Sequence, residues 1–261
     1  MNRRLASLVA LTVLSVSAII ADPSVFILDY HTFIGKANNG LDFSPAEFIK
    51  QLDRFEKLGF KWVSLDDAIA GKVEGYKNLV LTIDDGNHSV PAVVKDILKP
   101  RGIVPTLFVS AGLVLKEPFT IKPDTVKEMA GLGCIIGTHG YTHQYMTGKA
   151  FAANPDMVKK EISKPGPIIS EMLGKPQIYF AYPYGVLATG KESLVAAAGY
   201  QFGFSANGNL VPINFQSAGY NRYDVPRTIV YKGNIEKIYS DLERYAVKMV
   251  GMDSAAMVIP Q

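Results

Sequence analysis

The sequence predicts a single α/β domain in which parallel strands, each followed by a helix, form a complete or incomplete barrel. Short apolar, β-branched runs alternate with longer amphipathic stretches along the chain after Ala21. The chain has no internal repeat, low-complexity tract or linker-like composition shift, which favours one domain over residues 22–261. With 48% hydrophobic and 20% charged residues, the composition excludes disordered, collagen-like and coiled-coil classes.

Two further counts exclude other classes. Cys134 is the sole cysteine, so a disulfide-stapled scaffold and a cysteine-rich zinc module are excluded. A net charge of +3 gives no reason to expect a nucleic-acid partner.

Residues 1–21 have the features of a secretory signal peptide. A short basic region, Asn2-Arg3-Arg4, precedes an uncharged run from Leu5 to Ala21 that ends in small residues. Cleavage after Ala18 or after Ala21 fits this pattern. The alternative is an uncleaved anchor, which needs about 20 apolar residues. We therefore expect an exported protein, periplasmic or secreted, that contacts a membrane only through this segment if it stays uncleaved.

The first structural elements of the domain follow. The run Val25 to Leu28 predicts a strand, and Ser44-Pro45-Ala46-Glu47 predicts a helix start with an N-cap serine, a proline at N1 and a capping-box glutamate. The apolar spacing of Phe48, Leu52 and Phe55 defines its buried face, and Gly59 ends it.

The remaining elements alternate in the same way. Strands are expected at 61–63, 79–83, 104–109, 134–136, 178–180 and 202–204, and helices at 90–98, 124–132, 157–173 with a break at Pro165-Gly166-Pro167, 191–198 and 235–250. Roughly seven βα units result, and a βα barrel places its chemistry just after its strands.

Two adjacent carboxylates, Asp84 and Asp85, follow the strand at 79–83 and precede Gly86. Successive side chains point in different directions, so one can bind a metal while its neighbour handles protons. Gly86 lets the backbone turn sharply. For this tripeptide alone, a solvated turn is the competing interpretation.

Two of the four histidines, His139 and His143, follow the strand at 134–136. Imidazoles four residues apart share one side of a helical turn and can chelate one ion. Together with an aspartate from another strand end they predict three protein ligands with an open position, as in a catalytic metal site. A third cluster, Phe180 to Gly185, is an irregular turn whose backbone N–H groups could stabilise an oxyanion, or it could be an aromatic packing loop.

In this order the three clusters resemble the motifs of the polysaccharide deacetylases of the NodB homology class, carbohydrate esterase family 4. Thr82-Ile83-Asp84-Asp85-Gly86 is similar to Thr-Phe-Asp-Asp-Gly, His139 to His143 to His-Ser/Thr-x-x-His, and Phe180 to Gly185 to Arg-x-x-Pro-Tyr. The resemblance implies a distorted (β/α)7 barrel and metal-dependent removal of acetyl groups from N-acetylated sugars. It also implies that Asp84 is the general base, that Asp85, His139 and His143 bind the metal, and that the Tyr184 N–H faces the oxyanion.

The chain departs from the family pattern at three places. Ala181 stands where the family has an arginine that orients the base, and Arg227 is the candidate substitute; the alternative is a surface or structural arginine. Gly140 stands where a serine or threonine braces the metal loop. No histidine follows His143, so the acid of the family's C-terminal motif is missing.

His31 offers a replacement, because Tyr30-His31 resembles the Tyr-His of a family branch whose general acid is displaced to the first strand. The alternative for His31 is a surface loop residue, and we read His88 as a rim residue.

The expected partner is an acetylated, N-acetylglucosamine-containing polysaccharide, and the expected cofactor is a divalent metal: zinc, with cobalt, nickel and manganese as alternatives. Two other functions stay open, a catalytically silent carbohydrate-binding homologue and a hydrolase of small amides or of O-acetyl esters on xylan. Aromatic residues that could line a sugar groove are Tyr30, Trp62, Tyr141, Tyr182, Tyr184 and Tyr220.

Overall fold

The computed structural model describes residues 23–36 and 39–256, and within them parallel strands close into a barrel. Hydrogen-bonded neighbours run β1–β3–β4–β5–β6–β7–β8 and return to β1. The strands are β1 (Val25–Tyr30), β2 (Lys61–Trp62), β3 (Asn78–Ile83), β4 (Thr106–Val109), β5 (Ile135–Thr138), β6 (Tyr179–Ala181), β7 (Phe202–Asn207) and β8 (Val225–Ile229). The predicted distorted (β/α)7 barrel in one domain is confirmed.

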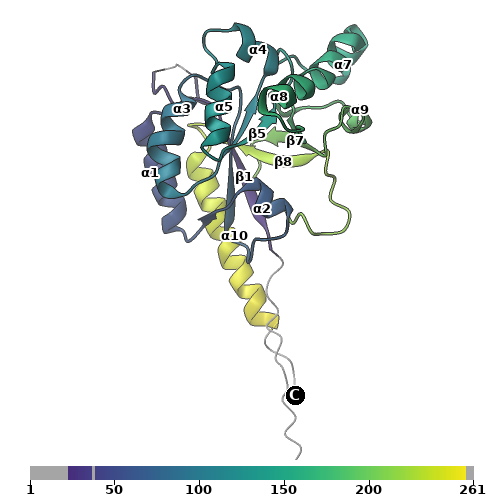
Figure 1. The fold of residues 1–261 in the computed structure, drawn as a ribbon. Coiled ribbons are helices and arrows are strands. Elements are labelled where there is room, and N and C mark those ends of the chain that lie inside the picture. Colours follow the sequence, from purple (N-terminus) through teal and green to yellow (C-terminus); the bar gives the residue numbers. More distant parts are fainter. Residues whose placement is uncertain (1–22, 37–38, 257–261) are drawn as a thin grey trace, which may run out of the picture.

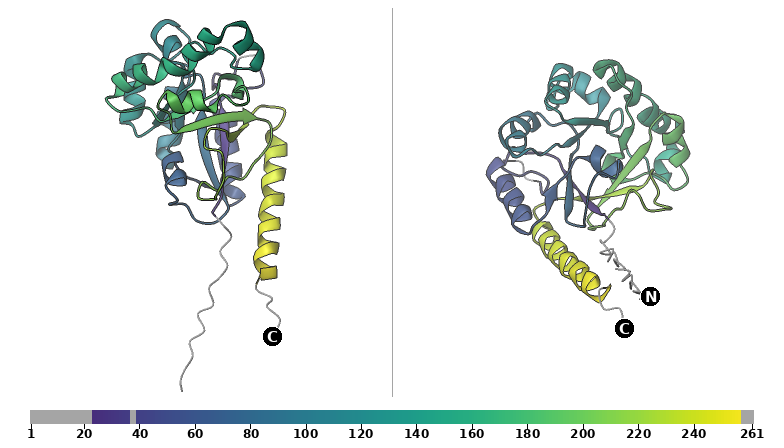
Figure 2. Two further views of the ribbon diagram at one scale, coloured as in Figure 1. Left: turned by 90° about the vertical axis from the view of Figure 1, so that its right-hand side faces the viewer. Right: turned by 60° about the horizontal axis from the view of Figure 1, so that its bottom comes forward.

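Helices surround this barrel (Figures 1 and 2). They are α1 (Pro45–Lys57), α2 (Leu65–Ile69), α3 (Val90–Val93), which continues as a π-helix over Val94–Leu98, α4 (Ala111–Lys116), α5 (Pro123–Gly131), α6 (Gly148–Ala153), α7 (Pro155–Ser163), α8 (Pro165–Leu173), α9 (Glu192–Ala197) and α10 (Ile235–Ala256). α10 runs past the lower end of the barrel in Figure 1. No helix among these residues combines the length and apolar character needed to cross a membrane. The predicted signal segment lies outside the described residues.

The distortion comes from β2, which is the short strand left out of the ring. β1 pairs with β3 along its whole length, from Val25 opposite Asn78 to Tyr30 opposite Ile83. On the other edge of β3, β2 pairs with the first residues and β4 with the last. β2 therefore acts as a wedge at the amino end, and the strands meet in one ring at the carboxyl end.

Local sequence accounts for the first helix as predicted. The Ser44 hydroxyl accepts a hydrogen bond from the Glu47 N–H at 3.2 Å, and the Glu47 carboxylate accepts one from the Ser44 N–H at 2.6 Å, which completes the capping box. Phe48, Leu52 and Phe55 are fully buried. The break at Pro165 is also present, because it separates α7 from α8. The short helices α2, α4 and α6 were not predicted, because five or six residues give little periodicity, although the equally short α9 was expected at 191–198.

Strand alternation divides the core into an outer and an inner layer. Phe26, Leu28 and Tyr30 of β1 belong to the cluster packed under the helices, whereas Val25 and Ile27 share an inner cluster with residues from other strands. That inner cluster includes Val80, Phe108, Phe204 and Val225. The next inward position of β1 is Asp29, of β3 Thr82 and of β8 Arg227, all buried. The apolar interior therefore gives way to a polar layer at the carboxyl end of the barrel.

Candidate metal centre and its surroundings

Asp85, His139 and His143 converge although they come from the ends of two different strands. Their ligand atoms all lie within 4.8 Å of one another. Asp85 Oδ1 lies 3.5 Å from His139 Nε2 and 3.2 Å from His143 Nε2, and the two Nε2 atoms are 3.2 Å apart. Three donor atoms thus surround one point.

The two histidines meet through a loop, so the expected helical turn is wrong. β5 ends at Thr138, and residues 139–145 are non-helical. The chain reverses through positive φ angles of 72° at Gly140 and 60° at His143. A four-residue spacing brings side chains together in a helix, but here a left-handed backbone does it instead.

Among the residues that the structure describes, the non-glycine residues with positive φ are Asp85 (69°), His143 (60°) and Tyr184 (58°). All three are residues that the sequence motifs single out. The left-handed conformation costs such residues about 1–3 kcal/mol each, and it persists only where surrounding contacts hold it. At Asp85 and His143 the left-handed conformation directs the side chains towards the same point. At Tyr184 it occurs in a turn that places the Tyr184 ring 4.6 Å from the His143 ring, centroid to centroid.

Hydrogen bonding selects the tautomer of His139. This ring is 2% exposed, and its Nδ1 lies 3.0 Å from the carbonyl oxygen of Ala181, which can only accept a hydrogen bond. Nδ1 therefore carries the proton, and the Nε2 lone pair faces Asp85 and His143. Burial lowers the pKa of His139, although Asp84 and Asp85 oppose this, and the neutral ring is favoured.

Arg227 lies beside Asp84 and is fully buried, so the alternative of a surface arginine is excluded. Its Nη1 and Nη2 donate to Asp84 Oδ1 and Oδ2, both at 2.7 Å. The same Nη1 lies 3.3 Å from Asp29 Oδ1. A planar guanidinium thus bridges two carboxylates inside the barrel, with both contacts to Asp84 in the bidentate geometry that arginine favours.

The two carboxylates respond differently to this arrangement. Burial by itself would raise the pKa of Asp84, but the charge of Arg227 and its paired hydrogen bonds outweigh burial, so the pKa is held well below its usual range. Burial raises the pKa of Asp29 to about 7, because Arg227 lies farther from it and Asp84 repels its charge. Asp84 is therefore ionised at neutral pH, whereas Asp29 titrates in that range.

His31 directly follows the last residue of β1 and lies close to Asp84. Ligand atoms of Asp29, His31 and Asp84 lie within 4.8 Å of one another, and Asp84 Oδ2 is 3.5 Å from His139 Nε2. His31 is half-buried, and its Nδ1 has no hydrogen-bond partner among the described residues. The exposed His88 stays apart, with its Nδ1 3.1 Å from the Phe119 carbonyl.

Sequence reasoning assigned no role to two neighbours of this site. Asp29 is two residues before His31, and a charged residue inside the buried run of β1 was a signal that could have been used. Tyr145 carried no signal: its ring stacks on that of Tyr184 at 3.6 Å and 9°, and both rings are about half exposed. The expected groove residues Tyr30 and Tyr182 are instead buried in the core.

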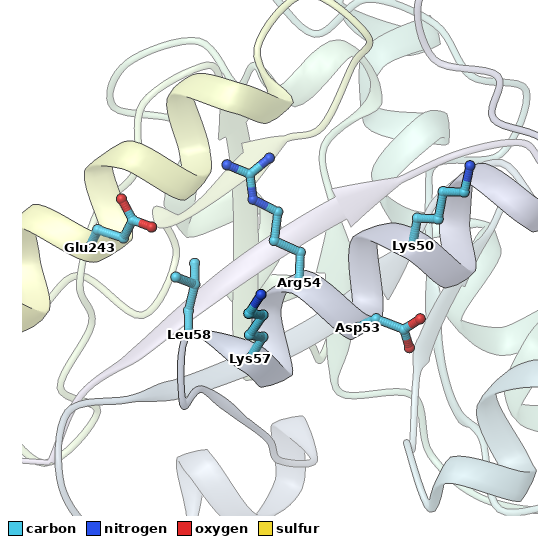
Figure 3. Close-up of a pocket in the computed structure, with 6 residues that line it drawn as sticks. All are labelled: Lys50, Asp53, Arg54, Lys57, Leu58 and Glu243. Atoms are coloured by element: carbon cyan, nitrogen blue, oxygen red, sulfur yellow. The ribbon is translucent and has the colours of Figure 1, made fainter.

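A separate groove lies on the outer wall of the barrel between α1 and α10 (Figure 3). It is lined by Lys50, Asp53, Arg54, Lys57, Leu58 and Glu243. None of these residues belongs to the site, and Arg54 is already paired with Glu236 at 2.7 Å.

Comparisons with known proteins agree with this geometry. A family model described as polysaccharide deacetylase matches residues 71–203, slightly more than half of the chain. The chain is 25% identical over 199 residues to a poly-beta-1,6-N-acetyl-D-glucosamine N-deacetylase of Staphylococcus aureus, covering 72% of this chain and 67% of that protein. It is 30% identical over 127 residues to an uncharacterized 30.6 kDa protein of Geobacillus stearothermophilus, covering 48% of this chain and 44% of that one.

Solved structures show the same barrel. IcaB from Ammonifex degensii superposes with a TM-score of 0.72 at 26% identity, over 86% of this chain and 98% of that chain. The Streptococcus pyogenes deacetylase PplD, at 22% identity and a TM-score of 0.69 over 84% and 98% of the two chains, shares the fold. With its closed seven-strand barrel, its Asp/His/His cluster and the match to the family model, this chain belongs to the polysaccharide deacetylase family.

Proposed function

We propose that this protein is a metal-dependent deacetylase that hydrolyses the N-acetyl groups of an N-acetylglucosamine-containing polysaccharide. The observation that carries the proposal is the meeting of Asp85, His139 and His143 beside an ionised, arginine-held Asp84. The similarity to the staphylococcal poly-beta-1,6-N-acetyl-D-glucosamine N-deacetylase supports an N-acetylglucosamine polymer as substrate. The predicted signal segment and this substrate class together support export.

The Asp/His/His group fits a divalent cation. Two imidazole nitrogens and one carboxylate oxygen suit zinc, and they also accept cobalt, nickel or manganese. The Ala181 carbonyl orients His139 as metal-bound histidines require, with Nδ1–H donated away and Nε2 directed inward. When bound there, such an ion supplies Lewis-acid chemistry: it lowers the pKa of a coordinated water towards about 7 and polarises the acetyl carbonyl.

Asp84 acts as the general base in this proposal. It takes the proton of the attacking water because Arg227 keeps the carboxylate ionised and fixes its plane through two hydrogen bonds of 2.7 Å. Arg227 does this from β8, which compensates for the alanine at position 181. Ala181 favoured a catalytically silent homologue, and a base held by Arg227 weakens that alternative.

His31 and Tyr184 complete the proposed set. The amine leaving group of an amide must be protonated. His31 lies next to Asp84, and its Nδ1 makes no hydrogen bond to any described residue. The Tyr184 N–H, in the turn Pro183–Gly185, is proposed to donate to the oxyanion. The stacked rings of Tyr145 and Tyr184 present an exposed aromatic surface beside His143, which supports a pyranose ring over a small amide as the substrate.

Acetate release tests the proposal. The zinc-loaded protein is assayed on chitin oligomers, poly-β-1,6-N-acetylglucosamine, peptidoglycan and acetylxylan, beside Asp84→Asn, His139→Ala and the rim control His88→Ala. We expect Asp84→Asn to bind zinc without releasing acetate, His139→Ala to lose both properties and His88→Ala to keep both. Wild-type turnover by Asp84→Asn would refute the base assignment, and release from acetylxylan alone would favour the esterase alternative.

A further inference from the structure

The loop that carries both histidine ligands lacks the hydroxyl side chain that its family resemblance leads one to expect. Position 140 is a glycine, which has no side chain that could brace the turn as a serine or threonine would. The loop nevertheless holds a left-handed residue at Gly140 and another at His143. Some other group must supply the contacts that keep this backbone in place.

Glu161 of α7 occupies the required position. Its side chain is buried, at 2% exposure, and it accepts hydrogen bonds from the loop backbone: the N–H of Tyr141 at 2.9 Å, of Thr142 at 2.9 Å and of Gln144 at 3.3 Å. The Thr142 hydroxyl donates at 2.6 Å. Every one of these neighbours is a donor, which matches an ionised carboxylate because that group only accepts.

The position of Glu161 leaves no space for a side chain at residue 140. A Cβ atom at position 140 would lie 2.7 Å from Glu161 Oε2 and 2.9 Å from Pro183 Cγ. The φ of 72° also disfavours any other residue there. The Glu161 carboxylate therefore lies where a side chain of residue 140 would lie, and it makes hydrogen bonds to the loop in place of the absent hydroxyl.

The other side of the loop is held by the start of α4. The Ser110 hydroxyl donates to the His139 carbonyl at 2.7 Å, and the Gly112 N–H donates to the Tyr141 carbonyl at 2.7 Å. These contacts engage the carbonyls of His139 and Tyr141, whereas Glu161 accepts hydrogen bonds from three of the loop's N–H groups. Of the contacts named here, those of Glu161 reach Thr142 and Gln144, the two neighbours of His143.

We propose that Glu161 is a positioning residue of the metal centre, whose carboxylate holds residues 140–144 so that the His139 and His143 rings face one ion. The inference rests on the proposed metal site. Loss of a residue that orients metal ligands weakens metal binding about 10–100-fold. A residue that merely fastened α7 to the barrel would lower stability and leave the affinity for metal unchanged.

The test compares wild-type protein with Glu161→Gln and with the control Glu171→Gln, an exposed glutamate on the next helix. Glu161→Gln keeps the shape but turns an amide NH2 group towards the loop donors. Zinc affinity of the chelator-stripped proteins is measured by competition with a chromophoric chelator, thermal unfolding is followed without metal, and acetate release is followed as zinc is raised.

We expect Glu161→Gln to bind zinc about 10–100-fold more weakly and to recover turnover at saturating zinc, with Glu171→Gln within about twofold of wild type. If Glu161→Gln does not fold, Thr142→Val, which removes a single hydroxyl donor, should show a smaller loss in the same direction. Wild-type zinc affinity in Glu161→Gln, with or without a lower melting temperature, would overturn the inference while leaving the proposed function intact. A wild-type protein that binds no zinc would overturn the metal site itself.

Discussion

Arg227→Met removes the guanidinium from the centre of the polar layer while keeping an unbranched side chain of similar length. Asp84, which is 2% exposed, then loses two charge-assisted hydrogen bonds of 2.7 Å, and Asp29 loses a cation at 3.3 Å. Breaking a buried pair from one side costs about 3–5 kcal/mol, because the remaining charge is left buried and unpaired. For a domain of this size that corresponds to a fall of about 6–20 °C in Tm.

The matched control is Arg54→Met, since Arg54 also makes paired contacts, to Glu236 at 2.9 and 2.7 Å, but on the surface. Side chains there are 45% and 74% exposed, so we expect a loss of about 1 kcal/mol or less. Urea unfolding of the metal-free proteins at pH 7, followed by far-UV circular dichroism, gives both values. The double variant Arg227→Met/Asp84→Asn should recover most of the loss, because the Asp84 charge is removed together with its partner and Asp29, whose pKa is already raised to about 7, can become neutral.

Two results would refute this reasoning. One is an Arg227→Met loss within about 1 kcal/mol of the Arg54→Met loss, which would mean that the buried pair contributes no more than a surface pair. The other is a double variant as unstable as the single one, which would show that the cost comes from packing.

The other predictions concern pH, substrate length and the turn at Gly185. The pKa of Asp29 is raised to about 7, so the stabilising contribution of this group is fully present below about pH 3.8 and is lost as the pH rises to 7. The unfolding free energy of wild type relative to Asp29→Asn should therefore fall by up to about 1.4 kcal/mol per pH unit in this window. A constant difference between the two proteins in urea unfolding from pH 4.5 to 7 would contradict this prediction. Tyr145→Ala should raise KM for long oligomers and leave KM for the N-acetylglucosamine dimer unchanged, and equal effects on both would exclude a stacking role for the exposed ring. Gly185→Ala places a Cβ atom 2.2 Å from the Ala206 carbonyl oxygen, whereas a Cβ atom at Gly190, which has a similar φ, would face open space. Gly185→Ala should therefore lower the unfolding free energy by at least about 2 kcal/mol more than Gly190→Ala. Similar losses in the two variants would count against a steric clash at Gly185.

Much of the fold could be predicted because its signals are local. The capping box at Ser44, the apolar face of α1 and the buried strand before Asp84 are each formed by residues that are close together in the sequence. The ends of several strands were displaced by one to three residues, and β7 runs on to Asn207, since strand ends depend on pairing with neighbours. The insertion of β2 beside β3 was not predictable, because it is a property of the ring and not of any segment.

The site divides in the same way. Residue types and their order along the chain predicted the Asp/Asp and His/His groups, but the reason given for the histidine pair was wrong: a loop with positive φ at His143, not a helical turn, brings the rings together. Neither Glu161 nor Tyr145 could be selected from the sequence, since a glutamate on an amphipathic helix and a tyrosine in a loop are ordinary residues.

The sequence by itself determined the class of the fold and the identity of the chemical groups, because periodicity, caps and motif residues are written in short stretches of chain. Tertiary structure decided which groups work together. Arg227 and Asp84 are 143 positions apart, and His31, Asp84 and His139 lie on three different strand ends. They meet because closing a parallel barrel brings every carboxyl end to one rim, and only there do burial, charge and hydrogen bonds between distant residues give the adjacent aspartates different environments.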